Sequence, residues 1–415
     1  CRIEEKPVVS LAPDSCAYLE DVETVYLPDS ILSIGYSAFR ECRRLRSIRF
    51  PEPLPTFDSN WLRNCISLER LELPGRLERI DASVFDSPCL KSLRIGAGAN
   101  DVLPGAFQKS KLEAIEVDSE NPLLTTDGKA LYSFDGSILV ALAVPVERYS
   151  VQAGCRAIAK KAFSHFSCLE TVGLPDSIEA IGDFSFSKTS VKTFEAPKSL
   201  RSIGEKAFFN CSKLSSVRLN EGLVDVQNNA FSGTAIKELR LPASVERLGN
   251  PLAADVGLSY VGRDATFSIA EGSNHLLLDE SGCLYRKTDK GLVVDRMMNP
   301  RITRYSVHPG TVAVGDDAFS GHGELEEVEL PEGFAVIGRR AFKACRRLLR
   351  ATCPSTLKSI GDEAFLDTAL EEISLPNALE HIGLNALVTY GAHHGERPTL
   401  KSVAVGEENA TYFVH

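Results

Sequence analysis

Apolar residues recur along this chain with a period of 22 or 23 residues. The prolines mark the period, since Pro175 and Pro197 are 22 residues apart and Pro331 and Pro354 are 23 apart. The clearest copies are 71–85 (LELPGRLERIDASVF), 172–186 (VGLPDSIEAIGDFSF), 194–208 (FEAPKSLRSIGEKAF), 328–342 (VELPEGFAVIGRRAF) and 373–387 (ISLPNALEHIGLNAL). A fixed period of this length indicates a repeat protein in which each coil stacks on its neighbours.

Each position of the repeat has a structural interpretation. The template is L-x-x-I-x-L-P-x-x-L-x-x-I-G-x-x-A-F-x-x-C, and residues 325–348 follow it almost completely. The I-x-L segment points two apolar side chains to one side of a short strand, and the proline ends that strand because it has no N–H to donate. Glycine supplies a corner where a side chain would clash or φ must be positive. Alternating Ala and Phe allow successive coils to interdigitate.

This pattern predicts a right-handed solenoid of 22–23-residue coils. The I-x-L strands are expected to form a parallel β-sheet on one face. Short strands and a single helical turn around each Ala-Phe pair are expected on the other. The predicted organisation is an N-terminal tether and cap over residues 1–18 and one solenoid over 19–415. Residues 250–266 fit the template poorly and receive no register.

Two segments, at about 118–148 and 270–304, interrupt the repeat. Asp127-Gly128, Asp135-Gly136 and Lys290-Gly291 each lie between short apolar runs, which is typical of β-hairpin turns. We therefore predict two β-hairpin insertions that project from one edge. They either cover a step in register or form protruding partner-binding elements. The terminal segment 400–415, with Val403 and Val405 at strand positions, is predicted to cap the last coil.

The repeat resembles a known family. The segments LPDSILSIGYSAFREC (27–42) and APKSLRSIGEKAFFNC (196–211) are similar to the BspA-like, or treponemal-type, leucine-rich repeat, and the resemblance covers roughly residues 19–405. It implies a curved leucine-rich-repeat solenoid and exposure on a bacterial cell surface. Some members of that family are adhesins that bind host matrix proteins.

Composition and charge exclude several classes of protein. The chain has 415 residues, of which 43% are hydrophobic and 25% charged, and its formal net charge is -10. The negative charge disfavours nucleic acid as a partner. No run of about 18 apolar residues is present, so the sequence predicts no membrane-spanning helix. No catalytic motif, cofactor-binding loop or set of spaced metal ligands occurs, so we expect a non-enzymatic protein without a cofactor.

Most of the 11 cysteines point to packing. Cys42, Cys65, Cys168, Cys211 and Cys345 occupy the same template position, where a free thiol packs as a small apolar group, and they are expected to stay reduced. Cys1 differs, because a chain that begins with Cys followed by a polar run resembles a bacterial lipoprotein after signal-peptide cleavage. Lipidation of Cys1, and with it an outer-membrane lipid anchor, is therefore expected, although a fragment that happens to start at Cys gives the same sequence.

The outward positions of the predicted strands give the candidate binding residues. One column contains Tyr26, Arg49, Glu72, Arg94, Glu116, Glu195, Arg218 and Arg240. Alternating charges on neighbouring strands are interpreted primarily as a solvent-exposed ladder of ion pairs, and secondarily as a ligand-binding face. Two blocks, Glu324–Glu332 and Arg339–Arg350, carry opposite charges, and we expect them to neutralise each other. A further basic cluster contains Arg43, Arg44, Arg46 and Arg49.

These observations predict a monomeric surface lipoprotein that binds other proteins, in the manner of an adhesin, through its solenoid face and its insertions. The expected ligand is a host or matrix protein. The alternative is a glycan-binding or cell-envelope scaffolding protein. Because glycan sites favour exposed aromatic platforms and the chain has one Trp, Trp61, the protein ligand is preferred.

Overall fold

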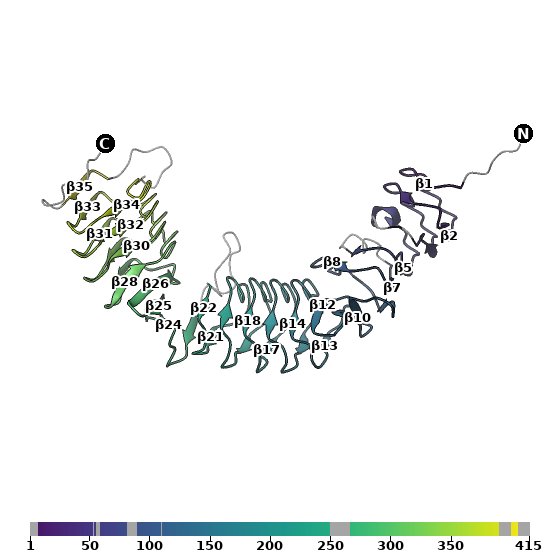
Figure 1. Cartoon of the computed structure of the whole chain (residues 1–415), viewed down its shortest axis with the longest axis horizontal. Coiled ribbons are helices and arrows are strands. Elements are labelled where there is room, and N and C mark those ends of the chain that lie inside the picture. Colours follow the sequence, from purple (N-terminus) through teal and green to yellow (C-terminus); the bar gives the residue numbers. More distant parts are fainter. Residues whose placement is uncertain are drawn as a thin grey trace, which may run out of the picture. The chain divides into compact units, whose positions relative to one another are not determined.

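The computed structural model describes residues 7–52, 54, 59–80, 89–108, 110–249, 266–389 and 400–405. The chain divides into two compact units, Cys1–Phe267 and Ser268–His415. Both are stacks of coils, as Figure 1 shows. Most coils give one strand to a front face, formed by the I-x-L segments, and one to a back face, formed by the x-I segments. A third side, the turn face, carries the Ala-Phe pairs. The predicted solenoid of stacked coils is thus confirmed.

In the first unit the front face contains short sheets. Its strands are β2 (Thr24–Tyr26), β4 (Ser47–Arg49), β5 (Arg70–Glu72), β7 (Ser92–Ile95), β9 (Ala114–Val117), β13 (Arg148–Ser150), β15 (Thr171–Gly173), β17 (Thr193–Glu195), β19 (Ser216–Arg218) and β21 (Glu238–Leu241). The parallel sheets β2-β4, β5-β7-β9, β13-β15 and β17-β19 follow one another along this face. Strand β23 (Thr266–Ile269) spans the boundary between the units.

The back face of the first unit carries the longer ladder. Its strands are β1 (Ser10–Leu11), β3 (Ser33–Ile34), β6 (Arg79–Ile80), β8 (Asp101–Val102), β10 (Leu124–Thr126), β11 (Ala130–Ser133), β12 (Ile138–Leu142), β14 (Ala157–Ile158), β16 (Ala180–Ile181), β18 (Ser202–Ile203), β20 (Asp225–Val226) and β22 (Arg247–Leu248). Eight of them join into one sheet in the order β10-β11-β12-β14-β16-β18-β20-β22. The more continuous sheet therefore lies on the face where the sequence predicted only short strands.

The second unit repeats this arrangement. Its front strands are β27 (Arg304–Ser306), β29 (Glu327–Glu329), β31 (Arg350–Thr352), β33 (Glu372–Leu375) and β35 (Ser402–Val405). Its back strands are β24 (Leu276–Leu278), β25 (Cys283–Thr288), β26 (Gly291–Met297), β28 (Thr311–Val314), β30 (Val336–Ile337), β32 (Ser359–Ile360) and β34 (His381–Ile382), and they form one seven-stranded sheet. Strand β35 pairs in parallel with β33, and Val403 lies opposite Ile373.

The two insertions are antiparallel meanders, as predicted, but each is part of the back sheet. Strands β10, β11 and β12 pair antiparallel, and β12 then pairs in parallel with β14 through Ile138 and Leu139. Strands β24, β25 and β26 do the same, and β26 pairs with β28. The third strand of each meander is thus a template for the next coil. The structure favours the interpretation in which the insertions cover a step in the solenoid.

The repeated glycine has a steric role on the back face. The amide of Gly338 donates to the Val314 carbonyl of the preceding coil at 2.9 Å and extends the ladder beyond the strand. A Cβ at Gly338 would lie 2.6 Å from the backbone carbon of Gly315. The φ angle of Gly338 is not in the left-handed region. Of the two reasons that the sequence left open, close backbone approach is therefore the one that applies.

The turn face replaces the predicted helical turns with tight bonded turns. In the coil around Phe208, the Phe209 amide donates to the Lys206 carbonyl, and the Phe208 amide donates to Ala230 of the next coil at 2.7 Å. Lys206 and Asn210 take left-handed φ angles of 54° and 58°. Among the described residues, the 3-10 helix η1 (Ser59–Leu62) is the only helix.

The core follows the template closely. In residues 325–348 the apolar template positions are all buried, namely Leu325, Val328, Leu330, Phe334, Ile337, Ala341, Phe342, Cys345 and Leu348. The template phenylalanines stack face to face, with ring centroids 4.9 Å apart for Phe186–Phe208 and 5.2 Å apart for Phe342–Phe365. Phe39 is buried as well. Phe85, predicted to belong to the same column, lies outside the described residues.

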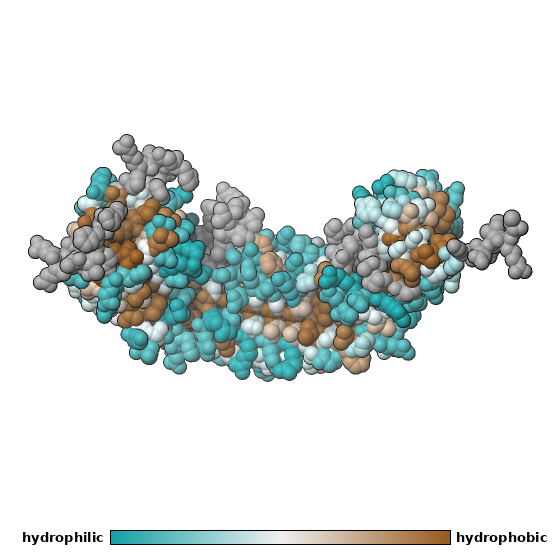
Figure 2. Space-filling model, turned by 45° about the horizontal axis from the view of Figure 1, so that its top comes forward, coloured by the Kyte–Doolittle hydropathy of each residue, from teal (hydrophilic) through white to brown (hydrophobic). Residues whose placement is uncertain are grey.

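Hydrophilic residues cover most of the surface visible in Figure 2, with apolar residues in bands between them. In the first unit, the coil at the N-terminal end leaves Val8, Val9, Leu19 and Leu32 exposed. Strand β1 pairs there with β3 in parallel register.

Candidate protein-binding face

The predicted column of outward residues lies on the front face of the first unit. Tyr26 is opposite Arg49 in the β2–β4 pair. Arg94 is flanked by Glu72 on β5 and Glu116 on β9. Glu195 is opposite Arg218 in the β17–β19 pair, and Arg240 is an exposed residue of β21. None of these side chains is buried, so the column is available to solvent.

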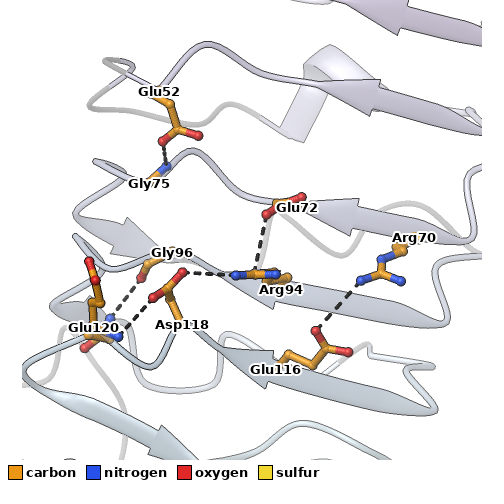
Figure 3. Close-up of polar contacts among 10 residues, drawn as sticks. Glu52, Arg70, Glu72, Gly75, Arg94, Gly96, Glu116, Asp118 and Glu120 are labelled. Carbon is orange, nitrogen blue, oxygen red and sulfur yellow. Dashed lines mark hydrogen bonds and ion pairs between the residues drawn. The ribbon is translucent and has the colours of Figure 1, made fainter.

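The charges pair differently from the expected simple alternation. Arg94 contacts Glu72 with 3.4 Å between Nε and Oε1, and it donates from Nη2 to Asp118 at 3.1 Å (Figure 3). Glu116 lies 3.8 Å from Arg70, two strands away, and not against Arg94 (Figure 3). The Glu120 amide and Arg94 together lower the pKa of Asp118. Because these groups are exposed, the pairs fix side-chain direction more than they add stability.

Arg49 does not pair with Glu72. Its guanidinium lies 3.2 Å from Asp29, and it donates to the Leu27 carbonyl at 3.1 Å. It also lies over the ring of Tyr26, 4.9 Å from the centroid, in a cation–π contact. The hydrogen bond from Arg49, followed by that from the Glu52 amide, lowers the pKa of Asp29. The arginine is thus held in a fixed position at the surface.

A groove lies between β4 and β5, where the first front sheet ends and the second begins. Its volume is about 520 Å³. The residues that line it are Arg46, Ser47, Ile48, Arg49, Phe50, Glu52, Arg70, Glu72, Leu73 and Pro74. Ile48, Phe50 and Leu73 are 5%, 3% and 2% exposed and form an apolar floor, while the charged residues form the rim.

Sequence reasoning identified two of these lining residues, Arg49 and Glu72, as members of the column but did not identify the groove. The available signal was the segment PEPLP at 51–55, which departs from the template directly after β4. The break in strand pairing at this point is a property of the fold. No spacing in the sequence predicts it.

The acidic residues of the groove already have partners. The Glu52 carboxylate accepts a hydrogen bond from the Gly75 amide at 3.0 Å (Figure 3), and Glu72 is held by Arg94. Two of its three basic residues, Arg46 and Arg70, are less engaged. Arg70 has only the 3.8 Å contact with Glu116, and Arg46 has no ion pair or side-chain hydrogen bond with any described residue.

The other charged candidates are largely neutralised, but the two blocks of the second unit pair mostly with residues outside both blocks, and not with each other as expected. In the second unit, Lys343 pairs with Glu363 at 2.6 Å and Arg346 with Asp367 at 3.4 Å, while Arg347 pairs with Glu324. In the basic cluster of the first unit, Arg43 pairs with Glu41 and Arg44 with Asp21, both at 3.1 Å. Arg46 is the exception in that cluster.

The cysteine column is a packing feature, with one exception. Cys42, Cys65, Cys211 and Cys345 are buried. Each donates its thiol hydrogen to a carbonyl of the preceding coil, as Cys345 does to Phe319 at 3.0 Å. Burial raises the pKa of Cys65 and Cys345 to about 12. Cys168 shares their template position but is exposed. Cys1, the predicted lipidation site, lies outside the described residues.

The insertions contain a feature that sequence reasoning missed. In the first, the hydroxyls of Tyr132 and Tyr149 lie 2.6 Å apart, and Tyr149 donates to Asp127 at 2.6 Å. In the second, Tyr285, Tyr305 and Asp279 form the same cluster. The signal was the repeated RYSV at 148–151 and 304–307. These clusters anchor each meander to the next front strand, so their role is structural.

Within the part of the chain that the structure describes, no helix has the length and apolar character needed to cross a membrane. No three His, Cys, Asp or Glu side chains of the described residues converge in a way that could hold a metal ion.

A family model, the BspA type leucine rich repeat region, matches residues 10–128, 143–254 and 299–391 in six copies. Among solved structures, the chain is similar to the pneumococcal vaccine antigen PcpA, with 22% identity, 69% of this chain and 71% of that chain covered, and a TM-score of 0.47. It is also similar to a leucine rich cell surface protein from Faecalibacterium prausnitzii, with 17% identity, 91% and 73% covered, and a TM-score of 0.40. A comparison with curated proteins finds no match. Because the family model covers well over half of the chain, this protein belongs to the BspA-type leucine-rich repeat family.

Proposed function

We propose that this protein is a non-enzymatic, surface-displayed binding protein that recognises another protein through the front face of its first unit. Proteins of this repeat family commonly mediate binding or adhesion. Host or matrix proteins are the ligand class that we propose. Recognition in a solenoid uses the outward positions of successive coils, because they present a broad surface on a rigid scaffold.

The observation that carries this proposal is the groove between β4 and β5 together with the fixed charges beside it. Arg49 is held by Asp29 and by the ring of Tyr26, and Arg94 is held by Glu72 and Asp118. Side chains that are already held lose little conformational entropy when a partner binds. An apolar floor inside a charged rim is also the usual anatomy of a protein interface.

The test is binding of the purified protein to a panel of immobilised matrix proteins alongside a glycan array. We expect saturable binding to at least one protein. The double variant Glu72→Arg with Arg94→Glu keeps the net charge and reverses the polarity of the face, and we expect it to weaken that binding at least tenfold. The matched control is Asp225→Arg with Arg247→Asp, which reverses a 3.0 Å ion pair on the back face.

Binding by the two double variants is compared after circular dichroism has shown that both are folded. Loss of binding in the front variant alone supports the proposal. Equal binding by both variants moves the site away from this face and contradicts it. Saturable glycan binding without any protein ligand supports the alternative, a glycan-binding protein.

Anchoring through Cys1 stays a prediction. Metabolic labelling with a fatty-acid analogue in a bacterial host tests it, since the protein should carry the label and a Cys1→Ser variant should not. A Cys1→Ser variant that keeps the label contradicts lipidation at this residue.

A further inference from the structure

Arg46 of the groove lacks the glutamate partner that basic residues have at the same position in other coils of the front face. The position directly before each front strand carries Glu23, Arg46, Glu69 and Lys91 in successive coils. Lys91 lies 3.0 Å from Glu69, and its counterpart further along the unit, Lys192, lies 2.5 Å from Glu170. Arg46 occupies the same position without any such partner among the described residues. Its guanidinium is free to bind an external group.

Arg70 adds a second available guanidinium from the next coil. It starts β5 and lines the same groove as Arg46. Its contact with Glu116 is 3.8 Å, too long for a hydrogen bond. The groove therefore receives unused N–H donors from both of the coils that form it, and planar guanidinium groups match the geometry of a carboxylate.

The glutamates and the apolar residues of the groove further restrict the chemical class of the ligand. Glu52 and Glu72 are committed to Gly75 and Arg94, so they do not neutralise the two arginines. They do place negative charge on the rim. A single carboxylate needs only the two arginines, whereas a polyanionic chain such as a sulfated glycan would also meet the two glutamates of the rim. The apolar floor of Ile48 and Leu73 suits the aliphatic part of a side chain.

We propose that the groove between β4 and β5 binds an acidic side chain, Asp or Glu, of an extended segment of the protein partner, with Arg46 and Arg70 holding its carboxylate. This inference rests on the proposed function and names the chemistry of the ligand. Arg49 lines the same groove but is already occupied by Asp29, and it serves as a fixed wall.

The test uses two synthetic peptides, acetyl-VTVEVTV-amide and the same peptide with Gln in place of Glu, at concentrations up to the millimolar range. We expect the Glu peptide to bind at least tenfold more tightly than the Gln peptide by calorimetry. Arg46→Ala and Arg70→Ala should each weaken the Glu peptide about tenfold. Arg63→Ala, which removes an exposed arginine from the turn face of the same coil, should leave it unchanged.

Three outcomes would overturn the inference. They are equal affinity for the two peptides, unchanged binding in both groove variants, and tighter binding of heparin than of the Glu peptide through the same arginines. The matrix panel separates this inference from the broader proposal. A matrix ligand that still binds both groove variants refutes the groove and leaves the front face standing. A wild-type protein that binds no matrix protein refutes the broader proposal, while the peptide comparison still decides the groove.

Discussion

The hydroxyl of Tyr149 donates to the carboxylate of Asp127 at 2.6 Å and so fastens a front strand to the hairpin turn of the first insertion. Tyr149 is 5% exposed, and its hydroxyl also lies 2.6 Å from that of Tyr132. The second insertion repeats the contact with Tyr305 and Asp279. Each meander is therefore bonded to the solenoid both through the back sheet and through a buried tyrosine pair.

Removal of the Tyr149 hydroxyl should show how much its hydrogen bond to Asp127 contributes to the free energy of unfolding. Tyr149→Phe leaves the ring in place and takes the donor from Asp127, so we expect the free energy of unfolding to fall by about 1–2 kcal/mol. Urea denaturation at pH 7.5 is the measurement. Tyr36→Phe, at a tyrosine that is 52% exposed, should change nothing beyond error. An unchanged midpoint for Tyr149→Phe would show that the contact does not contribute.

The tyrosine clusters also predict sensitivity to alkali. Burial, as the largest cause, raises the pKa of Tyr132, Tyr149, Tyr285 and Tyr305 above the ordinary value of 10.0. Above pH 10 the unfolded chain therefore releases protons that the folded chain retains, and stability falls as the pH rises. Below pH 10 this contribution is fully present.

The measurement is urea denaturation at pH 8 and at pH 10.5, with tyrosinate absorbance followed in the folded state. We expect a lower midpoint at pH 10.5 and ionisation of these four tyrosines only on unfolding. A Tyr149→Phe,Tyr305→Phe double variant should lose less stability between the two pH values than the wild type does. An equal loss in both proteins would assign the alkaline effect to other groups.

The phenylalanine column should carry much of the stability of each coil. Phe208 is fully buried, and its ring centroid lies 4.9 Å from that of Phe186 and 5.3 Å from that of Phe231. Phe208→Ala opens a cavity between two coils, so we expect a loss of about 3–5 kcal/mol, and Phe208→Leu should cost less. Phe134→Ala, at a side chain that is 61% exposed, serves as the control. Similar thermal shifts for Phe208→Ala and Phe134→Ala would contradict the role of the column.

Two glycines of successive coils separate steric from conformational effects. Gly338→Ala places a Cβ 2.6 Å from the backbone of Gly315, and backbone cannot move aside without breaking the ladder, so the expected cost is about 3 kcal/mol. Gly321→Ala meets no atom within 4 Å but keeps a φ of +79°, which should cost about 1 kcal/mol. Chemical denaturation of both variants checks the order. A larger loss for Gly321→Ala would mean that φ, and not close approach, selects glycine in this fold.

The cysteines should differ in reactivity although five of them share one template position. Alkylation at pH 8 should label Cys168 first, because it is exposed. Cys65 and Cys345 should stay unlabelled until the chain unfolds, since they are buried and their pKa is raised to about 12. Mass spectrometry of digested samples taken over time gives the order. Labelling of Cys345 as fast as Cys168 would contradict the burial of the column.

The sequence predicted the coil because its information is local and repeated. Leu325, Val328 and Phe342 fall at fixed positions, and an apolar residue at a fixed position in stacked coils must lie beside its counterpart. The outward placement of Tyr26 and Arg94 followed from the same period. Partners were harder to predict, because a long charged side chain reaches several acceptors. Arg49 contacts Asp29 and Tyr26 and not Glu72, and Glu116 contacts Arg70 and not Arg94.

The sequence alone determined the period, the residues of the core and the face to which each outward side chain belongs, since all three follow from a chain that returns to the same place every 22 or 23 residues. Only the tertiary structure decided where strand pairing stops. Hydrogen-bonding between β4 and β5 depends on small displacements of whole coils, and these depend on how many side chains pack at once. The groove, with Arg46 and Arg70 on its rim, lies where pairing between β4 and β5 is interrupted. The sequence of a single repeat does not predict it.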